Sequence, residues 1–355
     1  MQRVPSLDDL GVHRVLTPSG ALPQAADRLD ASLPLRDNEV RIDVDTLNID
    51  SASFAQIVGE VGRDEARVGE RIAAIVAERG KMQNPVTGSG GMLLGTVGAM
   101  GAAYGARSAL AVGDRVATLV SLTLTPLHLE AVRRVCLDTD QVEVRGHAIL
   151  WPSSPVVRMP ADLPEPLALA CLDVCGAPAQ VARMVRPGMR VLVIGAGKSG
   201  LLCMAEARRQ LGGSGRLVGV DLRPGWLPAA EQEGVVDAWG VASATEPCSL
   251  LDAVVPLLGG QPADLVINTA NVAGTEMASI LAVRDGGTVY FFNMATSFSR
   301  ATLGAEGIGR DATLIMGNGF APGHAELALE LVREVPFVRA RFGEMAGVAP
   351  APASS

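Results

Sequence analysis

The chain has 355 residues, of which 48% are hydrophobic and 19% charged, and this length and composition predict a globular protein of two domains. Its net charge of −8 at pH 7 argues against nucleic acid and anionic membranes as partners, because the average surface would repel both. The start, MQRVPSLDDLG, has no apolar core of signal-peptide length, and the five cysteines are scattered, so we expect a cytoplasmic protein that binds small molecules.

The first part of the chain is expected to be rich in β-strands. Val40–Ile49 alternates apolar and polar residues, and Gly113–Leu124 does so more loosely, which predicts a strand in each. The uncharged run Met82–Ala106 contains repeated glycines and Pro85, so it predicts turns and short buried strands in place of a membrane span. The proline-rich passage Trp151–Pro166 predicts an irregular segment and a domain boundary.

After this boundary, helical and strand patterns alternate. PLALACLDVCGAPAQVARMV and KSGLLCMAEARRQLG have the spacing of helices, whereas MRVLVIGAG, GRLVGVDL, ADLVINTA and GGTVYFFNM are short apolar runs typical of buried strands. Buried strands separated by helices predict a parallel, doubly wound sheet, so the fold class is α/β.

The strongest motif follows the first of these buried strands. Gly195, Gly197 and Gly200 form the pattern G-x-G-x-x-G, and Asp221 lies 21 residues after the last glycine, at the end of the next strand. Such glycines allow a tight turn and a close approach to a pyrophosphate, the helix N-terminus favours its negative charge, and the carboxylate can accept the ribose hydroxyls of NAD. The alternative is a simple glycine turn with a solvated aspartate.

Neighbouring residues refine this predicted cofactor site. Asp221 would repel a 2′-phosphate, so NAD is favoured over NADP, although Arg223 would offset part of that repulsion. Lys198 and Ser199 lie inside the motif, and Lys198 is either close to the pyrophosphate or a solvated lysine at a helix start. Ligands of open α/β sheets bind beyond the carboxyl ends of strands. These ends contribute Thr269, Ala270, Asn271 and Asn293 as further cofactor-binding candidates, each with an ordinary loop role as the alternative.

Longer stretches resemble known families. A strand-rich first part with GDRV, then RPG, a strand and GAGKSG resembles the medium-chain dehydrogenase/reductase superfamily. More closely, GVHRVLTPSGALPQ, DVDTLNIDSASF, GKMQNPVTGSGGM and NTANVAGTEMA are similar to the family of L-erythro-3,5-diaminohexanoate dehydrogenases. This resemblance implies NAD-dependent oxidative deamination at C3, giving 5-amino-3-oxohexanoate and ammonia, in lysine fermentation.

The resemblance also implies a domain plan. It places a GroES-like catalytic domain at residues 1–165, a Rossmann domain that binds NAD at 166–315, and a C-terminal segment, 316–355, that completes the catalytic domain. A homodimer is implied too, with the segment DATLIMGNG either a pairing edge strand or an ordinary internal strand.

The zinc ligands of related enzymes are missing. Gly91-Met92-Leu93 stands where zinc-dependent members of the superfamily have Gly-His-Glu, and TLNIDSASF contains no cysteine. We therefore expect no metal at the catalytic site. Cys171 and Cys175 are expected to pack in the core, with metal binding as the alternative. The four histidines show no ligand-like spacing, and surface or capping roles are expected for them.

The absence of the zinc ligands is consistent with amine oxidation, in which the charge that develops on the substrate is positive. Loss of hydride from a carbon that bears a neutral amine leaves an iminium cation, which a divalent metal would repel and a carboxylate would stabilise. Lys81 is the candidate base, with an exposed surface lysine as the alternative. The other candidates are polar residues of the first part of the chain, and for each of them a local capping or turn role is the alternative. The candidates for binding the substrate's ammonium groups are Asp45, Asp50 and Glu60, and those for its carboxylate are Asn84, Thr87 and Ser89. Ser53 is a candidate in the catalytic cleft.

Two other functions remain compatible with the motif. A zinc-free quinone or enone reductase of the same superfamily would prefer NADPH and an apolar electrophile. A protein that senses a dinucleotide without chemistry would keep the same fingerprint, because fold does not fix function.

Overall fold

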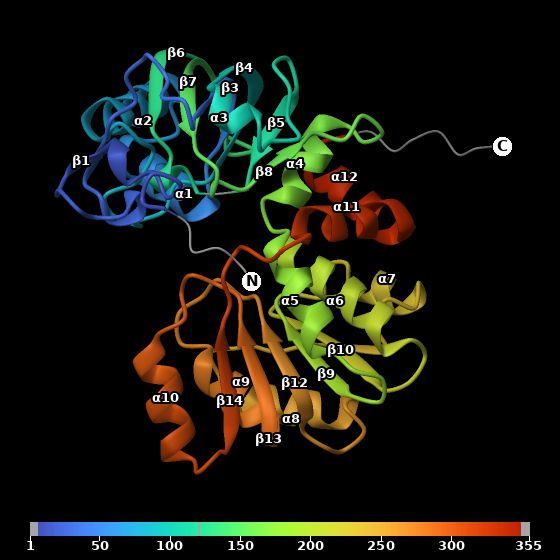
Figure 1. Cartoon of the computed structure of the whole chain (residues 1–355). Helices are drawn as coiled ribbons and strands as arrows, with labels where there is room; N and C mark the ends of the chain where they lie inside the picture. Colours follow the sequence, from blue (N-terminus) through green and yellow to red (C-terminus); the bar gives the residue numbers. More distant parts are fainter. Residues whose placement is uncertain (1–5, 120, 349–355) are drawn as a thin grey trace. The chain divides into compact units, whose positions relative to one another are not determined.

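The computed structural model describes residues 6–119 and 121–348, and its contacts divide the chain into two compact units, Met1–Glu165 and Pro166–Ser355 (Figure 1). The division falls inside the region where the proline-rich passage predicts a boundary. Each unit has its own six-stranded sheet.

The first unit is built on a six-stranded sheet with the strand order β6-β7-β3-β4-β5-β8, in which every neighbouring pair is antiparallel (Figure 1). Alternation of apolar and polar residues along β3 buries one of its faces against the core, as the sequence predicts. A separate antiparallel pair of strands, β1 and β2, precedes β3 in the chain. The strands are β1 (Val15–Thr17), β2 (Arg28–Leu29), β3 (Val40–Asn48), β4 (Met92–Met100), β5 (Arg115–Thr118), β6 (Leu127–Cys136), β7 (Gln141–Leu150) and β8 (Val156–Arg158).

Two helices follow β3 and are delimited by their own capping residues. Asp50 caps α1 (Ser51–Val61) by accepting a hydrogen bond from the Ser53 amide, and Asp64 caps α2 (Glu65–Arg79) in the same way. Gly80 ends α2 in the left-handed conformation, with φ of +63°. The remaining short elements of this unit are η1 (Val12–Arg14), η2 (Pro23–Ala25), α3 (Ala102–Gly105) and η3 (Leu122–Leu124).

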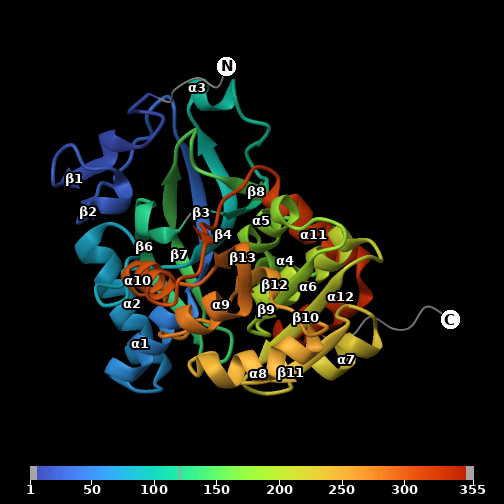
Figure 2. The ribbon, with the colours of Figure 1, turned by 90° about the horizontal axis from the view of Figure 1, so that it is seen from below.

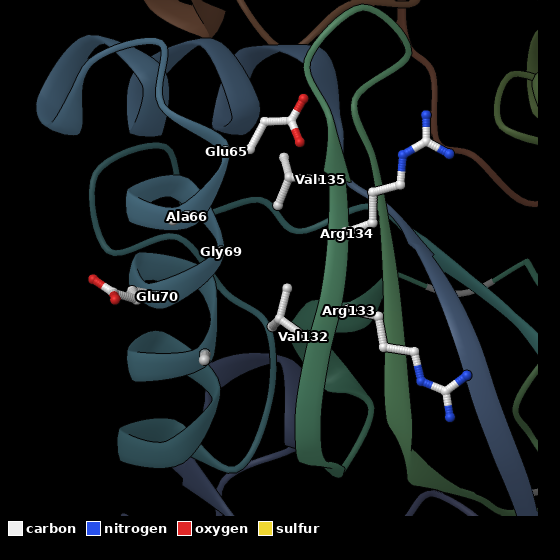
Figure 3. Close-up of a pocket in the computed structure, with 9 residues that line it drawn as sticks. Glu65, Ala66, Gly69, Glu70, Val132, Arg133, Arg134 and Val135 are labelled. Atoms are coloured by element: carbon white, nitrogen blue, oxygen red, sulfur yellow. The ribbon is translucent and has the colours of Figure 1, made fainter.

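Helix α2 lies along the edge strand β6, with a hollow of about 570 Å³ beside the contact (Figure 3). Its small residues Ala66 and Gly69 face Val132 and Val135, and a side chain added at Gly69 would lie 3.0 Å from Val132. Small residues thus let the helix approach the strand closely and cover this edge of the sheet. None of the predicted site residues lines this hollow.

The second unit contains a six-stranded, entirely parallel sheet with the order β11-β10-β9-β12-β13-β14. Its strands are β9 (Arg190–Ile194), β10 (Arg216–Asp221), β11 (Ala238–Val241), β12 (Ala263–Asn268), β13 (Val283–Phe291) and β14 (Ala312–Met316). Its helices are α4 (Glu165–Leu172), α5 (Gly176–Met184), α6 (Lys198–Leu211), α7 (Leu227–Gln232), α8 (Pro247–Leu257), α9 (Glu276–Ala282), α10 (Phe298–Gly307), α11 (His324–Glu334) and α12 (Pro336–Met345).

Alternate residues of the central strands enter two separate cores. Leu192 and Ile194 of β9 pack with α8, α9 and α10, whereas Val191 and Val193 pack with α5, α6 and α7. Figure 2 shows these two sets of helices on opposite sides of the parallel strands. The predicted doubly wound α/β fold is therefore confirmed.

The C-terminal segment differs from the prediction. Strand β14 belongs to the parallel sheet, α11 packs against α5 and α6, and α12 packs against α6. The ring of Phe337 in α12 meets that of Trp226 at 5.9 Å. The described part of segment 316–355 therefore packs with the second unit, whereas the resemblance implies that it completes the first.

Three local predictions also need correction. The expected strand Gly113–Leu124 is regular only over β5, because Ser121 caps a 3-10 turn by accepting a hydrogen bond from the Thr123 amide. The proline-rich passage contains the short strand β8. The single helix expected after the boundary is two helices, α4 and α5, bent by 53°.

Among the described residues, no single helix is long and apolar enough to cross a membrane. The bent pair of α4 and α5 reaches that length and apolarity only when its two helices are taken together.

A buried ion pair fastens the N-terminal segment to the first unit. The Arg14 guanidinium donates from Nε and Nη2 to the two carboxylate oxygens of Glu39, at 2.7 and 2.6 Å, and both side chains are buried. His13 Nε2 lies 2.7 Å from the same carboxylate, and the Arg36 amide donates to it at 2.7 Å. Burial alone would raise the pKa of Glu39, but these hydrogen bonds hold it below its usual value.

We expect Glu39→Gln to destabilise the first unit by about 3–5 kcal/mol, because it leaves the Arg14 charge buried and unpaired. Urea unfolding checks this, with Asp138→Asn as the control, since the Arg63–Asp138 pair is exposed and is worth less than about 1 kcal/mol.

The pH dependence provides a second readout. A lowered native pKa stabilises the fold above the ordinary carboxyl value, about 4.3, and this contribution disappears as the pH falls below it. Wild type should therefore lose more stability than Glu39→Gln between pH 6 and pH 3. Equal losses in the two proteins would contradict this role of Glu39.

Candidate functional site

Four strand ends of the second unit line up along one edge of its sheet. Ile194 at the end of β9 is level with Val220 on β10 and with Asn268 on β12, and Asn268 is level with Phe291 on β13. The predicted cofactor-binding residues lie at the ends of these strands, in the loops that follow them or in the first turn of α6. Parallel register therefore gathers these residues at one edge, as Rossmann geometry requires.

The glycine loop has the shape needed to hold a pyrophosphate. Gly195 has φ of +101°, and a β-carbon at Gly200 would lie 1.9 Å from the carbonyl oxygen of Gly195. A β-carbon at Gly197 would meet no atom within 4 Å. The first and third glycines are thus required by turn and packing, whereas the second faces open space beside the uncapped N-terminus of α6. These residues fit a dinucleotide.

The peptide units of this loop are held from two sides. Asp221 Oδ2 accepts a hydrogen bond from the Ala196 amide at 2.8 Å, and the indole Nε1 of Trp226 donates to the Ala196 carbonyl at 2.9 Å. Each carboxylate oxygen keeps further acceptor capacity for ribose hydroxyls. Sequence analysis missed Trp226, although a half-buried tryptophan close to Asp221 needs an acceptor for its N–H.

Two predicted cofactor residues are used mainly to build the site. Thr269 donates its hydroxyl proton to the carbonyls of Ile194 and Gly195, at 3.0 and 3.2 Å. Asn293 accepts from the Ala295 amide and the Thr296 hydroxyl. Buried Asn268, which was not predicted, donates to Thr275 and Ser279 at 2.9 Å each and accepts from the Ala270 amide. Its signal was an amide directly after the apolar run Leu265–Ile267 of β12.

The remaining predicted cofactor residues lie at the open side of the same loops. Lys198 and Ser199 form the half-buried first turn of α6, and Ala270 is half-buried after β12. Arg223 and Asn271 are exposed. These positions leave their side chains available to a ligand at this edge.

In the first unit, the start of α1 and the loop that precedes β4 form one polar cluster. Ser53 Oγ lies 2.6 Å from the Thr87 hydroxyl, and Asn84 Nδ2 donates to the Ser53 carbonyl at 3.3 Å. Gly91, with φ of +106°, lets the loop lie against the chain before α1, because a β-carbon there would be 2.1 Å from the Asn48 carbonyl. We name Asp50, Ser53, Asn84 and Thr87 the α1 cluster.

Asn84 has a positioning role in this cluster. Its amide nitrogen donates to the Ser53 carbonyl and to Gln56 Oε1, and its oxygen accepts from the amides of Val86 and Thr87. These four bonds use the full capacity of a side-chain amide, and the residue is buried. Asn84 therefore shapes the loop and has no bond left for a substrate.

The three candidate carboxylates differ in what they bind. Asp45 is paired with Arg115, which also binds Glu165 at 2.8 Å, and Glu60 lies 2.9 Å from Arg71 at the far end of α1. Asp50 uses Oδ1 as the cap of α1, whereas its Oδ2 is buried and has no hydrogen-bond partner among residues 6–119 and 121–348. Asp50 alone of the three offers an unused buried oxygen to a cation, and the structure does not bring Glu60 to the cluster.

Lys81 is enclosed by the first unit and is not an exposed surface lysine. Its side chain is fully buried, and its ammonium donates to the Pro23 carbonyl at 3.0 Å. Burial, assisted by the positive charge of Arg79, lowers the pKa of Lys81 to about 8. None of the hydrogen bonds among the described residues joins it to the α1 cluster.

The positions expected for zinc ligands belong to the core. Met92 and Leu93 begin β4 and are buried. No group of three or more His, Cys, Asp or Glu side chains that could hold a metal occurs in the described ranges. Cys171 and Cys175 are buried, and burial raises the pKa of Cys175 to about 12, which disfavours the thiolate that a metal needs.

The histidines are not all isolated, contrary to the sequence-based expectation. His13 binds Glu39, and His324 is buried with its ring 5.2 Å from that of Phe320. His128 and His147 face each other from neighbouring strands, with ring centres 5.3 Å apart. Spacing along the chain gave no sign of this pair, because strand register brings it together.

Comparisons with known proteins agree with this architecture. Residues 13–160 match the model of the L-erythro-3,5-diaminohexanoate dehydrogenase N-terminal domain. An L-erythro-3,5-diaminohexanoate dehydrogenase of Acetoanaerobium sticklandii is 48% identical over 94% of this chain and 98% of its own length. One of Fusobacterium nucleatum is 48% identical over 94% of this chain and 97% of its own length.

This chain belongs to the L-erythro-3,5-diaminohexanoate dehydrogenase family. A crystal structure of CurK enoyl reductase superposes with a TM-score of 0.54 at 16% identity, over 89% of this chain and 91% of that one. At this identity the likeness concerns the fold alone, which is that of the medium-chain dehydrogenases and reductases. The α1 cluster and Lys81 lie within the segment that matches the L-erythro-3,5-diaminohexanoate dehydrogenase family model.

The burial of Lys81 generates a stability prediction. Its native pKa of about 8 lies below the ordinary lysine value, about 10.4. At a pH between these two values, the unfolded chain therefore binds the lysine proton more tightly than the folded protein does. Wild-type stability should rise from pH 8 to pH 10, and Lys81→Met should be more stable than wild type by about 1–3 kcal/mol at pH 7.

Urea unfolding at several pH values measures this difference. The only other lysine is Lys198, and Lys198→Met, as the control, should change stability by less than about 0.5 kcal/mol at every pH. A Lys81→Met protein that is less stable than wild type at pH 7 would show that the ammonium is a structural element.

Proposed function

We propose that this protein is an amine dehydrogenase that deaminates L-erythro-3,5-diaminohexanoate at C3, giving 5-amino-3-oxohexanoate and ammonia with a nicotinamide dinucleotide as hydride acceptor. The identity of 48% to two relatives of that name, over nearly their whole length, carries the proposal. The open second glycine and the free N-terminus of α6 support the cofactor class.

A bound nicotinamide ring would accept the hydride that leaves C3 of the substrate. Departure of that hydride makes the substrate nitrogen an iminium cation, and the buried Oδ2 of Asp50 is the negative group that the α1 cluster offers to it. A carboxylate fixed at a helix N-terminus needs no reorganisation as the charge develops. The Ser53 and Thr87 hydroxyls of the same cluster, 2.6 Å apart, would hold the substrate or the attacking water.

Lys81 is our proposed base for the substrate ammonium. Of the 30 basic residues, 28 are arginine, and the two lysines are Lys81, which follows the end of α2, and Lys198, in the first turn of α6. Arginine stays protonated in proteins, whereas a buried lysine can release its proton near neutral pH. Only one of the three ammonium donors is directed at Pro23, so Lys81 can exchange a proton with the substrate or through water.

We further propose that the cofactor is NAD, with NADP used more weakly. The carboxylate of Asp221 stands at the end of β10, where it would repel a 2′-phosphate. Exposed Arg223, two residues away, would reduce that repulsion without removing it. The reaction itself is proposed to proceed without metal, because the residues at the zinc positions are core methionine and leucine.

A cytoplasmic homodimer acting in lysine fermentation is the proposed setting. Strand β14 is the last strand of its sheet, and large apolar side chains near it are exposed: Met316 by 43%, Phe298 by 70% and Leu303 by 65%. An unpaired edge flanked by apolar side chains favours pairing with a second copy. Sedimentation velocity tests this, and a monomer at micromolar concentration would contradict it.

The activity is tested with purified protein, NAD and 3,5-diaminohexanoate at mildly alkaline pH, by following NADH absorbance and ammonia release together. We expect equal amounts of both, faster turnover with NAD than with NADP, and no loss after treatment with a chelator. Turnover of an enone with NADPH in place of the diamine would identify a reductase. Dinucleotide binding without either reaction would identify a sensor.

Asp50→Asn isolates the proposed carboxylate. Asparagine still caps α1, so folding and dinucleotide affinity should be kept, while kcat/KM for the diamine should fall about 10²–10³-fold. Glu60→Gln, at the other end of α1, is the control and should stay within about twofold of wild type. Equal activity of Asp50→Asn and wild type would contradict the mechanism.

A further inference from the structure

A second groove of the first unit gathers side chains of a different kind from the α1 cluster. It encloses about 480 Å³ between the segment 28–33, helix α2 and the strands β6 and β7. Two imidazoles, those of His128 and His147, line it together with Asp30. None of the four residues of the α1 cluster lines this groove.

The two histidines are fixed opposite each other by the sheet. His128 on β6 is the register partner of His147 on β7, so their side chains project on the same face. Their ring centres are 5.3 Å apart, with 39° between the ring planes. Antiparallel pairing therefore holds both imidazoles at one place without help from a loop.

A hydrogen bond settles which nitrogen of His147 is free to coordinate. Nε2 lies 2.8 Å from the Ala31 carbonyl oxygen, and a carbonyl only accepts, so Nε2 carries the proton. Nδ1 of the neutral ring then keeps a lone pair. Histidines that bind metals commonly donate their other N–H to a backbone carbonyl in this way, which fixes the ring and makes the free nitrogen more basic.

The distance between the rings matches two ligands of one tetrahedral ion. A zinc–nitrogen bond is about 2.0–2.1 Å, which puts each ring centre about 3.2 Å from the ion, and two such rings at the tetrahedral angle are about 5.2 Å apart. The observed 5.3 Å agrees with this value. The spacing of the two strands therefore suits a shared ion.

We propose that His128 and His147 bind one divalent transition-metal ion of the zinc type, separately from the catalytic site. No third His, Cys, Asp or Glu completes a metal-binding group there within the described ranges, so water fills the other positions. Two imidazoles and water give weak binding, with a dissociation constant on the order of 1–100 μM. Imidazole selects zinc, copper and nickel over magnesium and calcium.

The bound ion would join three parts of the first unit. It ties β6 to β7 directly, and through the Nε2–Ala31 bond it also stabilises the segment beside β2. Binding should therefore raise the melting temperature of the folded protein. It has no part in hydride transfer in this proposal.

Calorimetric titration of the full, untagged, metal-free protein with zinc chloride at pH 7.5 tests the proposal. We expect one ion per chain in wild type, at least tenfold weaker binding in His128→Asn and in His147→Asn, and no binding of magnesium. Arg145→Gln, on the same strand β7, is the matched control and should bind zinc as wild type does. His128 is exposed, so its substitution keeps the fold.

A spectroscopic signature separates this site from adventitious binding. Copper(II) bound to wild type should show coupling to two nitrogen nuclei in its electron paramagnetic resonance spectrum, and to fewer in His128→Asn. Absence of zinc binding in wild type would overturn the proposal, and so would unchanged zinc binding in His128→Asn. Diamine turnover, measured in parallel, tests the proposed function independently of either result.

Discussion

A carboxylate taken out of water must be paired, and Arg14 meets this requirement for the buried Glu39. Glu39 is held by Arg14, Asp45 by Arg115, and Glu60 by Arg71. The cost of an uncompensated buried charge explains the Arg14–Glu39 pair, whereas the side chains of Asp45 and Glu60 are 47% and 40% exposed and gain less from their pairs. The same cost applies to Asp50, whose Oδ2 is buried and has no hydrogen-bond partner among the described residues. A cationic ligand is the natural complement of such an oxygen.

The same electrostatic argument connects the α1 cluster to the chemistry of an amine. Enzymes that oxidise alcohols stabilise a developing negative charge, for which a metal is suited. The L-erythro-3,5-diaminohexanoate dehydrogenase family acts, by its name, on a diamine. In this chain the α1 cluster, our proposed site, offers a carboxylate oxygen and two hydroxyls. The distribution of charge therefore fits a positive intermediate.

Local patterns predicted what depends on neighbours in the sequence. The glycine fingerprint and the buried strands of the second unit each occupy a few consecutive residues, and the structure contains both. The cap at Asp50, which the sequence offered as the alternative to a substrate contact, is also present. The family resemblance quoted from four stretches was also confirmed. Periodicity did not reveal the break between α4 and α5, because both helices are apolar on all sides near the break.

Features that depend on tertiary contacts could not be predicted in this way. The sequence predicted Asn84 as a substrate ligand, whereas in the structure its side chain is fully used by four hydrogen bonds within the protein. Trp226 and Asn268 hold the cofactor loops through partners tens of residues away. The C-terminal segment was assigned by resemblance, whereas α11 and α12 pack on the second unit through side chains that no motif marks.

The scarcity of lysine has a practical consequence for chemical modification. Lys81 is enclosed, and Lys198 opens the first turn of α6 beside the pyrophosphate cradle. Reagents that acylate or cross-link amines therefore find, among the described side chains, one accessible target, at the start of α6. Conjugation at Lys198 would cover the proposed cofactor site, whereas arginine side chains would remain unmodified.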